Sequence, residues 1–149
     1  MLTQETSELR TLLEREQELL SELLSVRNPQ QRLATMVEHA RRRPSLDASM
    51  RTESHRVEGC LVRTWFIAEM CGGKCRFSAD SDAVTLKALL GLLCDLYSGF
   101  TPEEIALTSP DFLRRTGVLH QIAENRQRTV LRVAAQIHEF AARQIRVAA

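Results

Sequence analysis

Cys60 is the residue of this 149-residue sequence whose neighbours most favour covalent chemistry. It follows Gly59, and glycine adopts backbone angles that other residues avoid, so the chain can bend there and present the thiol at a loop tip. A cysteine reacts as its thiolate, and nearby positive charge lowers the thiol pKa. Arg56 and Arg63 flank Cys60 and supply such charge. A second interpretation stays open at this point, because free cysteines often behave as small, inert, buried hydrophobic residues.

Cys71 and Cys75 form a Cys-x-x-x-Cys pair around Gly72-Gly73-Lys74, a spacing that suits a metal-binding turn in a hairpin. Tetrahedral zinc needs two further ligands, and the four histidines are scattered without paired spacing. Three interpretations of the pair therefore remain: a zinc site, a resolving or relaying thiol, and incidental cysteines. Cys94 lies in a leucine-rich segment, which predicts a buried packing role.

Other enzyme sites leave no trace in the sequence, which contains no glycine-rich phosphate loop, nucleophile elbow, His-x-x-x-His pair or paired carboxylates. The formal net charge of +1 does not indicate a nucleic-acid or membrane partner. The one basic run, Arg41 to Arg43, precedes Pro44 and is typical of the end of a helix. The chain has no membrane-length apolar segment and its polar N-terminus is unlike a secretory signal. We therefore expect a cytoplasmic protein with reduced thiols.

The N-terminal part of the chain is expected to be helical. Leucines recur at helical spacing within residues 6–27, so residues 1–27 are interpreted as a leucine-rich amphipathic helix that belongs to a single domain, residues 1–149. Asn28 and Pro29 then have the types expected of an N-cap and a first helical turn. Residues 45–53 are polar and irregular, and they predict a loop.

A small antiparallel sheet is expected between residues 56 and 78, where β-branched and aromatic residues gather on both sides of Gly72-Gly73. A short first strand is predicted at Arg56-Val57. Ser81 is expected to cap the next helix, which is apolar around most of its circumference and therefore buried. Thr101-Pro102 opens a further helix, and a long amphipathic helix is expected from residue 120 to the C-terminus. These elements predict an α+β domain, helix-rich and packed on a small antiparallel sheet.

Several short segments, in one order and spacing over roughly residues 33–143, together resemble the signature of SufE-type proteins. The segments are Arg51-Thr52-Glu53, Arg56-Val57-Glu58-Gly59-Cys60, Arg63-Thr64-Trp65, Phe77-Ser78-Ala79-Asp80-Ser81-Asp82-Ala83, Lys87, Tyr97-Ser98-Gly99-Phe100-Thr101-Pro102-Glu103-Glu104-Ile105 and Asn125-Arg126. Two features depart from the family pattern. Val62 stands where a serine or asparagine is usual, and the N-terminal helix is leucine-rich where an aromatic-rich stretch is usual.

The resemblance implies a SufE-like fold of helices on a small antiparallel sheet, and a function in sulfur transfer. Cys60 is then the acceptor that takes persulfide sulfur from a cysteine desulfurase of the SufS or CsdA type and increases its turnover. Asp80 and Arg126 occupy family positions near the cysteine loop, where an ion pair between them would brace it. Arg63 would steer the partner or favour the thiolate, whereas Trp65 and Tyr97 are expected to be packed residues, Tyr97 with its hydroxyl at the surface.

The same resemblance implies that the chain carries no cofactor of its own, since the pyridoxal phosphate belongs to the desulfurase. A downstream sulfur acceptor or cluster scaffold would receive the sulfur, in support of iron–sulfur cluster assembly. Two alternatives remain at this point. One is a helical interaction module that pairs through its leucine-rich helix while Cys60 is inert, and the other is a small zinc protein.

Overall fold

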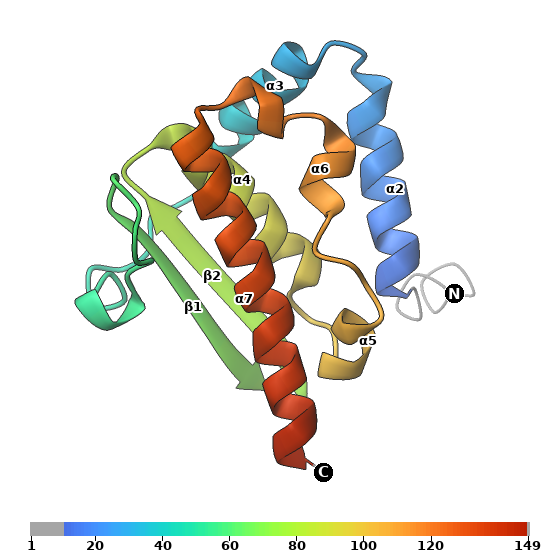
Figure 1. The fold of residues 1–149 in the computed structure, drawn as a ribbon, viewed down its shortest axis with the longest axis vertical. Coiled ribbons are helices and arrows are strands. Elements are labelled where there is room, and N and C mark those ends of the chain that lie inside the picture. The colour runs from blue at the N-terminus through green and yellow to red at the C-terminus, as the bar shows by residue number, and fades with distance from the viewer. Residues whose placement is uncertain (1–10, 149) are drawn as a thin grey trace.

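The structure is a computed structural model that describes residues 11–148. That part of the chain contains six α-helices, two short 3-10 turns and one antiparallel hairpin, which lies at one side of the helices (Figure 1). In chain order the elements are α2 (Leu12–Ser25), α3 (Pro29–Arg41), η1 (Glu53–His55), β1 (Thr64–Cys71), β2 (Lys74–Ser81), α4 (Val84–Tyr97), α5 (Pro102–Ala106), α6 (Phe112–Thr116), η2 (Leu119–Gln121) and α7 (Glu124–Ala148). The predicted fold class, a helix-rich α+β fold on a small sheet, is confirmed.

Local capping residues set the beginning of the first helices. The Thr11 hydroxyl accepts a hydrogen bond from the Glu14 amide at 3.1 Å, and α2 begins directly after Thr11. The Asn28 side chain accepts from the Gln30 amide at 2.8 Å, as its N-cap position predicts. The part of the predicted N-terminal helix that precedes Thr11 lies outside the described residues.

The hairpin pairs β1 with β2 along their full length, from Thr64 opposite Ser81 to Cys71 opposite Lys74. Gly72 and Gly73 both have positive φ angles, 60° and 80°, which the tight turn requires and which glycine adopts without steric cost. The predicted pair of strands around these glycines is therefore confirmed.

The predicted strand at Arg56-Val57 is wrong. Arg56 forms only an isolated bridge with Trp65, and the Val57 amide donates once to the carbonyl of Thr64 at 2.9 Å. Pairing cannot extend further because the η1 turn precedes these residues and the bend at Gly59 follows them. The chain from residue 57 to 63 is consequently a loop.

Helix α4 lies at the centre of the fold, packed against β2 on one side and α3 on the other (Figure 1). Leu86, Leu89, Leu90 and Leu93 are at most 1% exposed, as the apolar sequence of this helix predicts. The helix begins at Val84 with Ala83 as its N-cap residue, so the prediction that Ser81 caps it is wrong. The Ser81 hydroxyl instead contacts the hydroxyl of Thr64, opposite it in the hairpin, at 2.9 Å.

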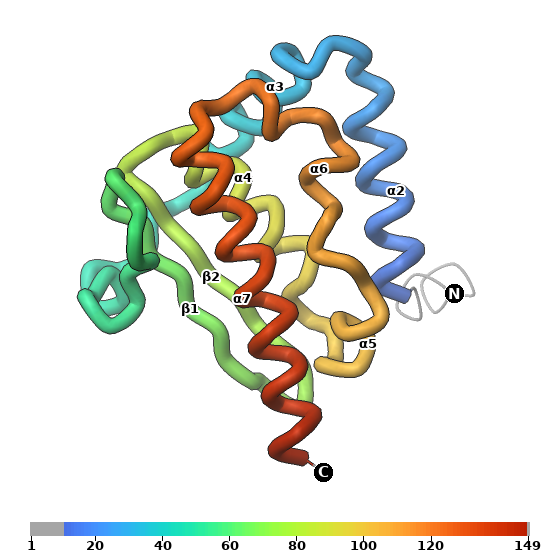
Figure 2. Tube along the Cα trace, viewed as in Figure 1, coloured from blue at the N-terminus to red at the C-terminus, as the bar shows by residue number. Residues whose placement is uncertain are grey.

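Helix α7 packs against α4, α5 and β1, and its N-terminal end completes the surroundings of the cysteine loop. It begins at Glu124, four residues later than the predicted start, because residues 119–121 form the separate η2 turn. The connection from α3 to β1 passes beside the hairpin, and its end at Cys60 reaches the first turns of α7 (Figure 2). No helix within residues 11–148 is both long and apolar enough to cross a membrane.

Candidate functional site

The loop of residues 57–63 bends sharply at Gly59, and a hydrogen bond from Arg132, here called the Arg132 clamp, holds it against α7. Gly59 has a φ angle of 76°, a left-handed conformation that disfavours any side chain. The Arg132 guanidinium donates to the carbonyl of Glu58, and a Cβ atom added at Gly59 would lie 3.2 Å from its Nη1. The sharp bend predicted at Gly59 is therefore present, and it brings Cys60 directly after the clamped carbonyl.

The Cys60 sulfur lies between α7 and β1 and is half-buried. The hydroxyl of Thr129, on α7, donates to Sγ at 3.3 Å, and the hydroxyl of Thr64, on β1, lies 3.5 Å from Sγ. The next side chain, Leu61, is 84% exposed. The loop therefore shelters the thiol and presents a leucine to solvent.

The surroundings of Cys60 favour its ionised form. Partial burial alone would raise the pKa of the Cys60 thiol, because it removes water from the thiolate. Hydrogen bonds from the Thr129 and Thr64 hydroxyls and the Val62 amide oppose this, as does the positive charge of Arg126, and the pKa lies below its usual value. Val62 contributes through its backbone amide, so the unusual valine side chain at this position does not remove the interaction.

Arg126 is the charged side chain, among the predicted ones, that acts on the Cys60 thiol. It lies in the first turn of α7 and donates to the Thr85 hydroxyl at 3.0 Å, which ties the beginnings of α7 and α4 together. Arg63 is mostly exposed and forms an ion pair with Asp82 at 2.9 Å. The structure thus brings Arg126, but not Arg63, into electrostatic contact with Cys60.

The expected ion pair between Asp80 and Arg126 is not formed. Asp80 is 2% exposed, and its carboxylate lies 3.7 Å from both the Arg51 Nε and the Lys87 Nζ. It also accepts hydrogen bonds from the backbone amides of Leu46, at 3.0 Å, and Ser81, at 2.9 Å. Asp80 therefore fixes the loop that follows α3 to the end of β2.

Trp65 is buried, as expected, and the Arg51 guanidinium lies 4.1 Å from the centre of its ring. Tyr97 is also buried, at 1% exposed, but the prediction that its hydroxyl reaches the surface is wrong. That hydroxyl donates to the carboxylate of Glu16, which is itself buried in α2, at 2.8 Å. Burial raises the pKa of Glu16, and the Tyr97 hydrogen bond opposes that rise only in part.

The other cysteines differ from Cys60 in their surroundings. Burial raises the pKa of Cys75 to about 11 and that of Cys94 to about 12, with a further rise from nearby Glu103 and Asp95 respectively. Cys71 is exposed at the hairpin turn. Register places Cys75 opposite Met70, and its thiol contacts the Met70 sulfur at 3.7 Å. Among the described residues, no three His, Cys, Asp or Glu side chains are placed to hold a metal ion.

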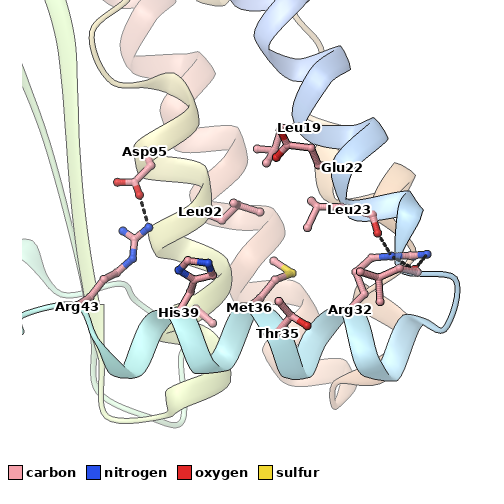
Figure 3. A pocket seen from close by; sticks show the side chains of 12 residues that line it. Leu19, Glu22, Leu23, Arg32, Thr35, Met36, His39, Arg43, Leu92 and Asp95 are labelled. Atoms are coloured by element: carbon pink, nitrogen blue, oxygen red, sulfur yellow. Dashed lines mark hydrogen bonds and ion pairs between the residues drawn. The ribbon is translucent and has the colours of Figure 1, made fainter.

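A cavity of about 400 Å³ lies elsewhere, between α2, α3 and α4 (Figure 3). Leu19, Leu23, Met36 and Leu92 provide much of its apolar lining, and the Arg43–Asp95 ion pair lies at one end. None of the residues that surround Cys60 lines it. The chemistry predicted from the sequence therefore belongs to the loop and α7, and not to this cavity.

Sequence reasoning missed Thr129, Thr64 and Arg132. Thr129 is separated from Cys60 by 69 positions, and nothing in its local sequence distinguishes it from other helical threonines. Thr64 stands within the segment that carries the family resemblance, but its hydroxyl was not assigned a role. The packing of α7 against the loop brings Thr129 and Arg132 to it, and the turn from the loop into β1 brings Thr64.

Comparison with known proteins connects this arrangement to a family. A family model described as SufE, Fe-S metabolism associated domain, matches residues 17–141. An uncharacterized SufE-like protein of Synechocystis is 27% identical over 99 residues, which cover 66% of this chain and 62% of that protein. The chloroplastic quinolinate synthase of Arabidopsis thaliana is 37% identical over 90 residues, 60% of this chain but 12% of the synthase. The chain therefore spans less than two thirds of the length of these relatives.

A solved structure shares the fold. The solution structure of a hypothetical protein from Thermus thermophilus superimposes with a TM-score of 0.70 at 23% sequence identity, covering 88% of this chain and 96% of that one.

A further sequence relative is SufE-like protein 1 of Arabidopsis thaliana, described as chloroplastic or mitochondrial. It is 28% identical over 116 residues, which cover 77% of this chain and 31% of that protein.

Proposed function

This chain belongs to the SufE family, and from that premise we propose that it accepts persulfide sulfur on Cys60 from a cysteine desulfurase and passes it on. Membership links the chain to iron–sulfur metabolism. The finer steps are the proposal: Cys60 as acceptor, a desulfurase as donor, and a downstream acceptor or cluster scaffold as recipient. The pyridoxal phosphate that releases sulfur from cysteine would belong to the desulfurase.

The observation that carries the proposal is the set of donors around one thiol. Two hydroxyls, one backbone amide and one guanidinium favour the thiolate of Cys60, whereas burial holds Cys75 and Cys94 in the thiol form. The thiolate is the nucleophile in exchange at sulfur. Of these three thiols, Cys60 is therefore the one whose surroundings favour the thiolate that sulfur acceptance needs.

The exchange step balances without an added oxidant or reductant. The Cys60 thiolate attacks the outer sulfur of a persulfide on the partner's cysteine, and a new S–S bond forms at Sγ. The original S–S bond breaks, and its electron pair leaves with the partner's cysteine as a thiolate. Cys60 then carries the persulfide, and the desulfurase is free for another turnover.

Supporting roles follow from the contacts. Arg126 stabilises negative charge at Sγ, and Asp80 holds the loop after α3 in place through Leu46, Arg51 and Lys87. Arg63 is exposed beside the loop and is proposed to meet the partner, as is Leu61 at the loop surface.

Mass spectrometry after incubation with a desulfurase and cysteine tests the function. Trypsin cleaves after Arg56 and Arg63, so residues 57–63 form a peptide in which Cys60 is the single cysteine. We expect this peptide, digested without reductant, to gain the mass of one sulfur atom. The peptides with Cys71, Cys75 and Cys94 provide the internal control. Equal labelling of all four thiols would contradict a dedicated acceptor.

A further inference from the structure

We infer that Thr129 is a residue of the sulfur-accepting site, whose hydroxyl proton turns between the carbonyl of Asn125 and the sulfur of Cys60 as the thiol loses its proton. The inference rests on the proposed function of Cys60, because it concerns how that nucleophile is kept ready. It adds a residue that neither the sequence nor the comparisons assign.

The geometry gives the hydroxyl two acceptors and one proton. Thr129 is 5% exposed, so water does not readily satisfy its hydroxyl. Its Oγ1 lies 3.3 Å from the Cys60 Sγ and 3.2 Å from the carbonyl oxygen of Asn125, one helical turn before it. A threonine hydroxyl has a single O–H donor and can also accept, so it donates to one of these atoms at a time.

The charge on sulfur decides between the two acceptors. A neutral thiol is a weak acceptor, so Thr129 donates to the Asn125 carbonyl, as helical threonines commonly do, and the thiol can donate to Oγ1. A thiolate is charged, and hydrogen bonds to charged acceptors are the stronger ones. The proton of Thr129 then turns to Sγ. The change requires rotation of one O–H bond and no movement of the backbone.

Thr64 is less free to make the same change. Its Oγ1 is 3.5 Å from the Cys60 Sγ, but it lies nearer to the Ser81 hydroxyl, at 2.9 Å, and to the carbonyl oxygen of Val62, at 3.1 Å. Its proton therefore has two closer acceptors. Thr64 supports the site, while Thr129 has the shorter contact with sulfur.

The charged side chains around the loop keep their charge and their partners when Cys60 ionises. Arg126 faces the thiol from α7, and Arg132, on the same helix, is occupied by the carbonyl of Glu58. On the loop side, Arg63 is paired with Asp82, which follows β2. These charges do not change with the ionisation of Cys60, whereas the Thr129 hydroxyl reorients with it.

The test measures the reactivity of Cys60 in the free protein. Iodoacetamide labelling of the 57–63 peptide across a pH series gives the pH midpoint of thiolate formation. Thr129→Val keeps the shape of the side chain and removes the hydroxyl, and we expect the midpoint to rise by about one pH unit. Thr129→Ser keeps the hydroxyl and should retain the wild-type midpoint.

A matched control comes from α3. The hydroxyl of Thr35 donates to the Gln31 carbonyl at 2.9 Å, one turn earlier in a helix that does not carry the Cys60 site. Thr35→Val should leave the midpoint unchanged. If Thr129→Val does not fold, as judged by circular dichroism, Thr129→Ala serves as the second variant and should show the same rise.

Two results would overturn the inference. One is a wild-type midpoint in the folded variant that lacks the hydroxyl. The other is an equal rise in Thr129→Ser, which would assign the effect to packing. Because no desulfurase is present, these outcomes are independent of the sulfur-transfer experiment: failure of wild-type Cys60 to gain sulfur would reject the proposed function and leave the measured midpoints standing.

Discussion

Cys60 and Cys94 are thiols of the same chain, and their surroundings move their pKa values in opposite directions. Cys94 lies in α4, 4% exposed, where burial and the neighbouring Asp95 disfavour the thiolate. Cys60 also loses hydration, yet hydroxyl and amide donors and the charge of Arg126 outweigh that loss. Partial burial therefore does not raise the pKa of a cysteine when hydrogen-bond donors and a nearby positive charge replace the water around its sulfur.

The two thiols also differ in how they are held. Cys94, the core thiol, lies in α4, which packs against both α3 and β2. The Cys60 loop depends on a few contacts at its ends, chiefly the Arg132 clamp on Glu58 and the hydroxyls of Thr129 and Thr64. Such a segment can open locally at less cost than a packed helix. Of these two thiols, Cys60 is therefore the one that a partner could reach by displacing a loop.

The largest contrast is expected from serine substitutions at the two cysteines. Cys60→Ser should abolish stimulation of the desulfurase, because the nucleophilic sulfur is gone, whereas Cys94→Ser should retain it. Stability should show the reverse order. Serine at 60 can still accept from Thr129, so the unfolding free energy should change little, while a hydroxyl at 94 should cost about 1–3 kcal/mol.

Desulfurase activity with cysteine, combined with urea unfolding of each variant, measures both halves of this contrast. Full stimulation by Cys60→Ser would reject sulfur acceptance at Cys60. Lost stimulation in a stably folded Cys94→Ser would show that the core thiol takes part.

The next largest effect is expected at Asp80. Its carboxylate is buried beside Arg51 and Lys87, so Asp80→Ala removes the carboxylate beside Lys87 and one of the two that contact Arg51, and it should cost about 3 kcal/mol of unfolding free energy. A pair at the surface would leave the fold intact on substitution, whereas the buried carboxylate of Asp80 makes a loss of stability the expected result.

Asp82 is the matched control for that measurement, since it is two residues away and more exposed, with Arg51 and Arg63 as partners. Asp82→Ala should cost less than about 1 kcal/mol. Equal losses in urea unfolding of the two variants would contradict the distinction.

Alkaline pH should lower the free energy of unfolding through the buried thiol of Cys94. A pKa raised from 9.0 to about 12 means that folded Cys94 stays protonated while the unfolded chain ionises. Its stabilising contribution is complete below pH 9 and is lost as pH rises from 9 toward 12, by about 1.4 kcal/mol per pH unit at most. Unfolding of wild type and Cys94→Ala between about pH 7 and pH 10.5 isolates this loss, because other groups titrate equally in both. Parallel pH profiles of the two proteins would contradict the assignment.

The smallest effect concerns the charge near Cys60. Arg126→Ala removes the cation that favours the thiolate, so the midpoint of Cys60 alkylation should rise by about half a pH unit, with slower sulfur acceptance. Arg128 is exposed on the same helix and is not among the groups that act on Cys60. Arg128→Ala is therefore the control, and an equal shift in both variants would indicate a general charge effect.

Features that depend on neighbours within a few residues could be predicted from the sequence. Thr101, Pro102 and Glu104 form the capping box that begins α5, and the two glycines after Cys71 form the hairpin turn. The Gly59 bend before Cys60 is equally local. These elements could be predicted because caps and tight turns are closed by short-range hydrogen bonds and backbone angles. The order and spacing of the short segments also predicted membership of the SufE family, which the family comparison confirms.

Contacts between side chains far apart in the sequence depend on the tertiary structure. Asp80 pairs with Arg51 and Lys87 and not with Arg126. The hydroxyl of Tyr97 donates to the buried carboxylate of Glu16. Thr129 came to Cys60 because α7 packs over the loop, although 69 positions separate them. Helical periodicity predicts which face of a helix is buried, but the partner of a polar side chain depends on how that face is placed against other elements. For this reason Cys60 and Arg126 could be named from the sequence as candidate site residues, whereas the hydroxyls of Thr129 and Thr64 that favour the thiolate could not.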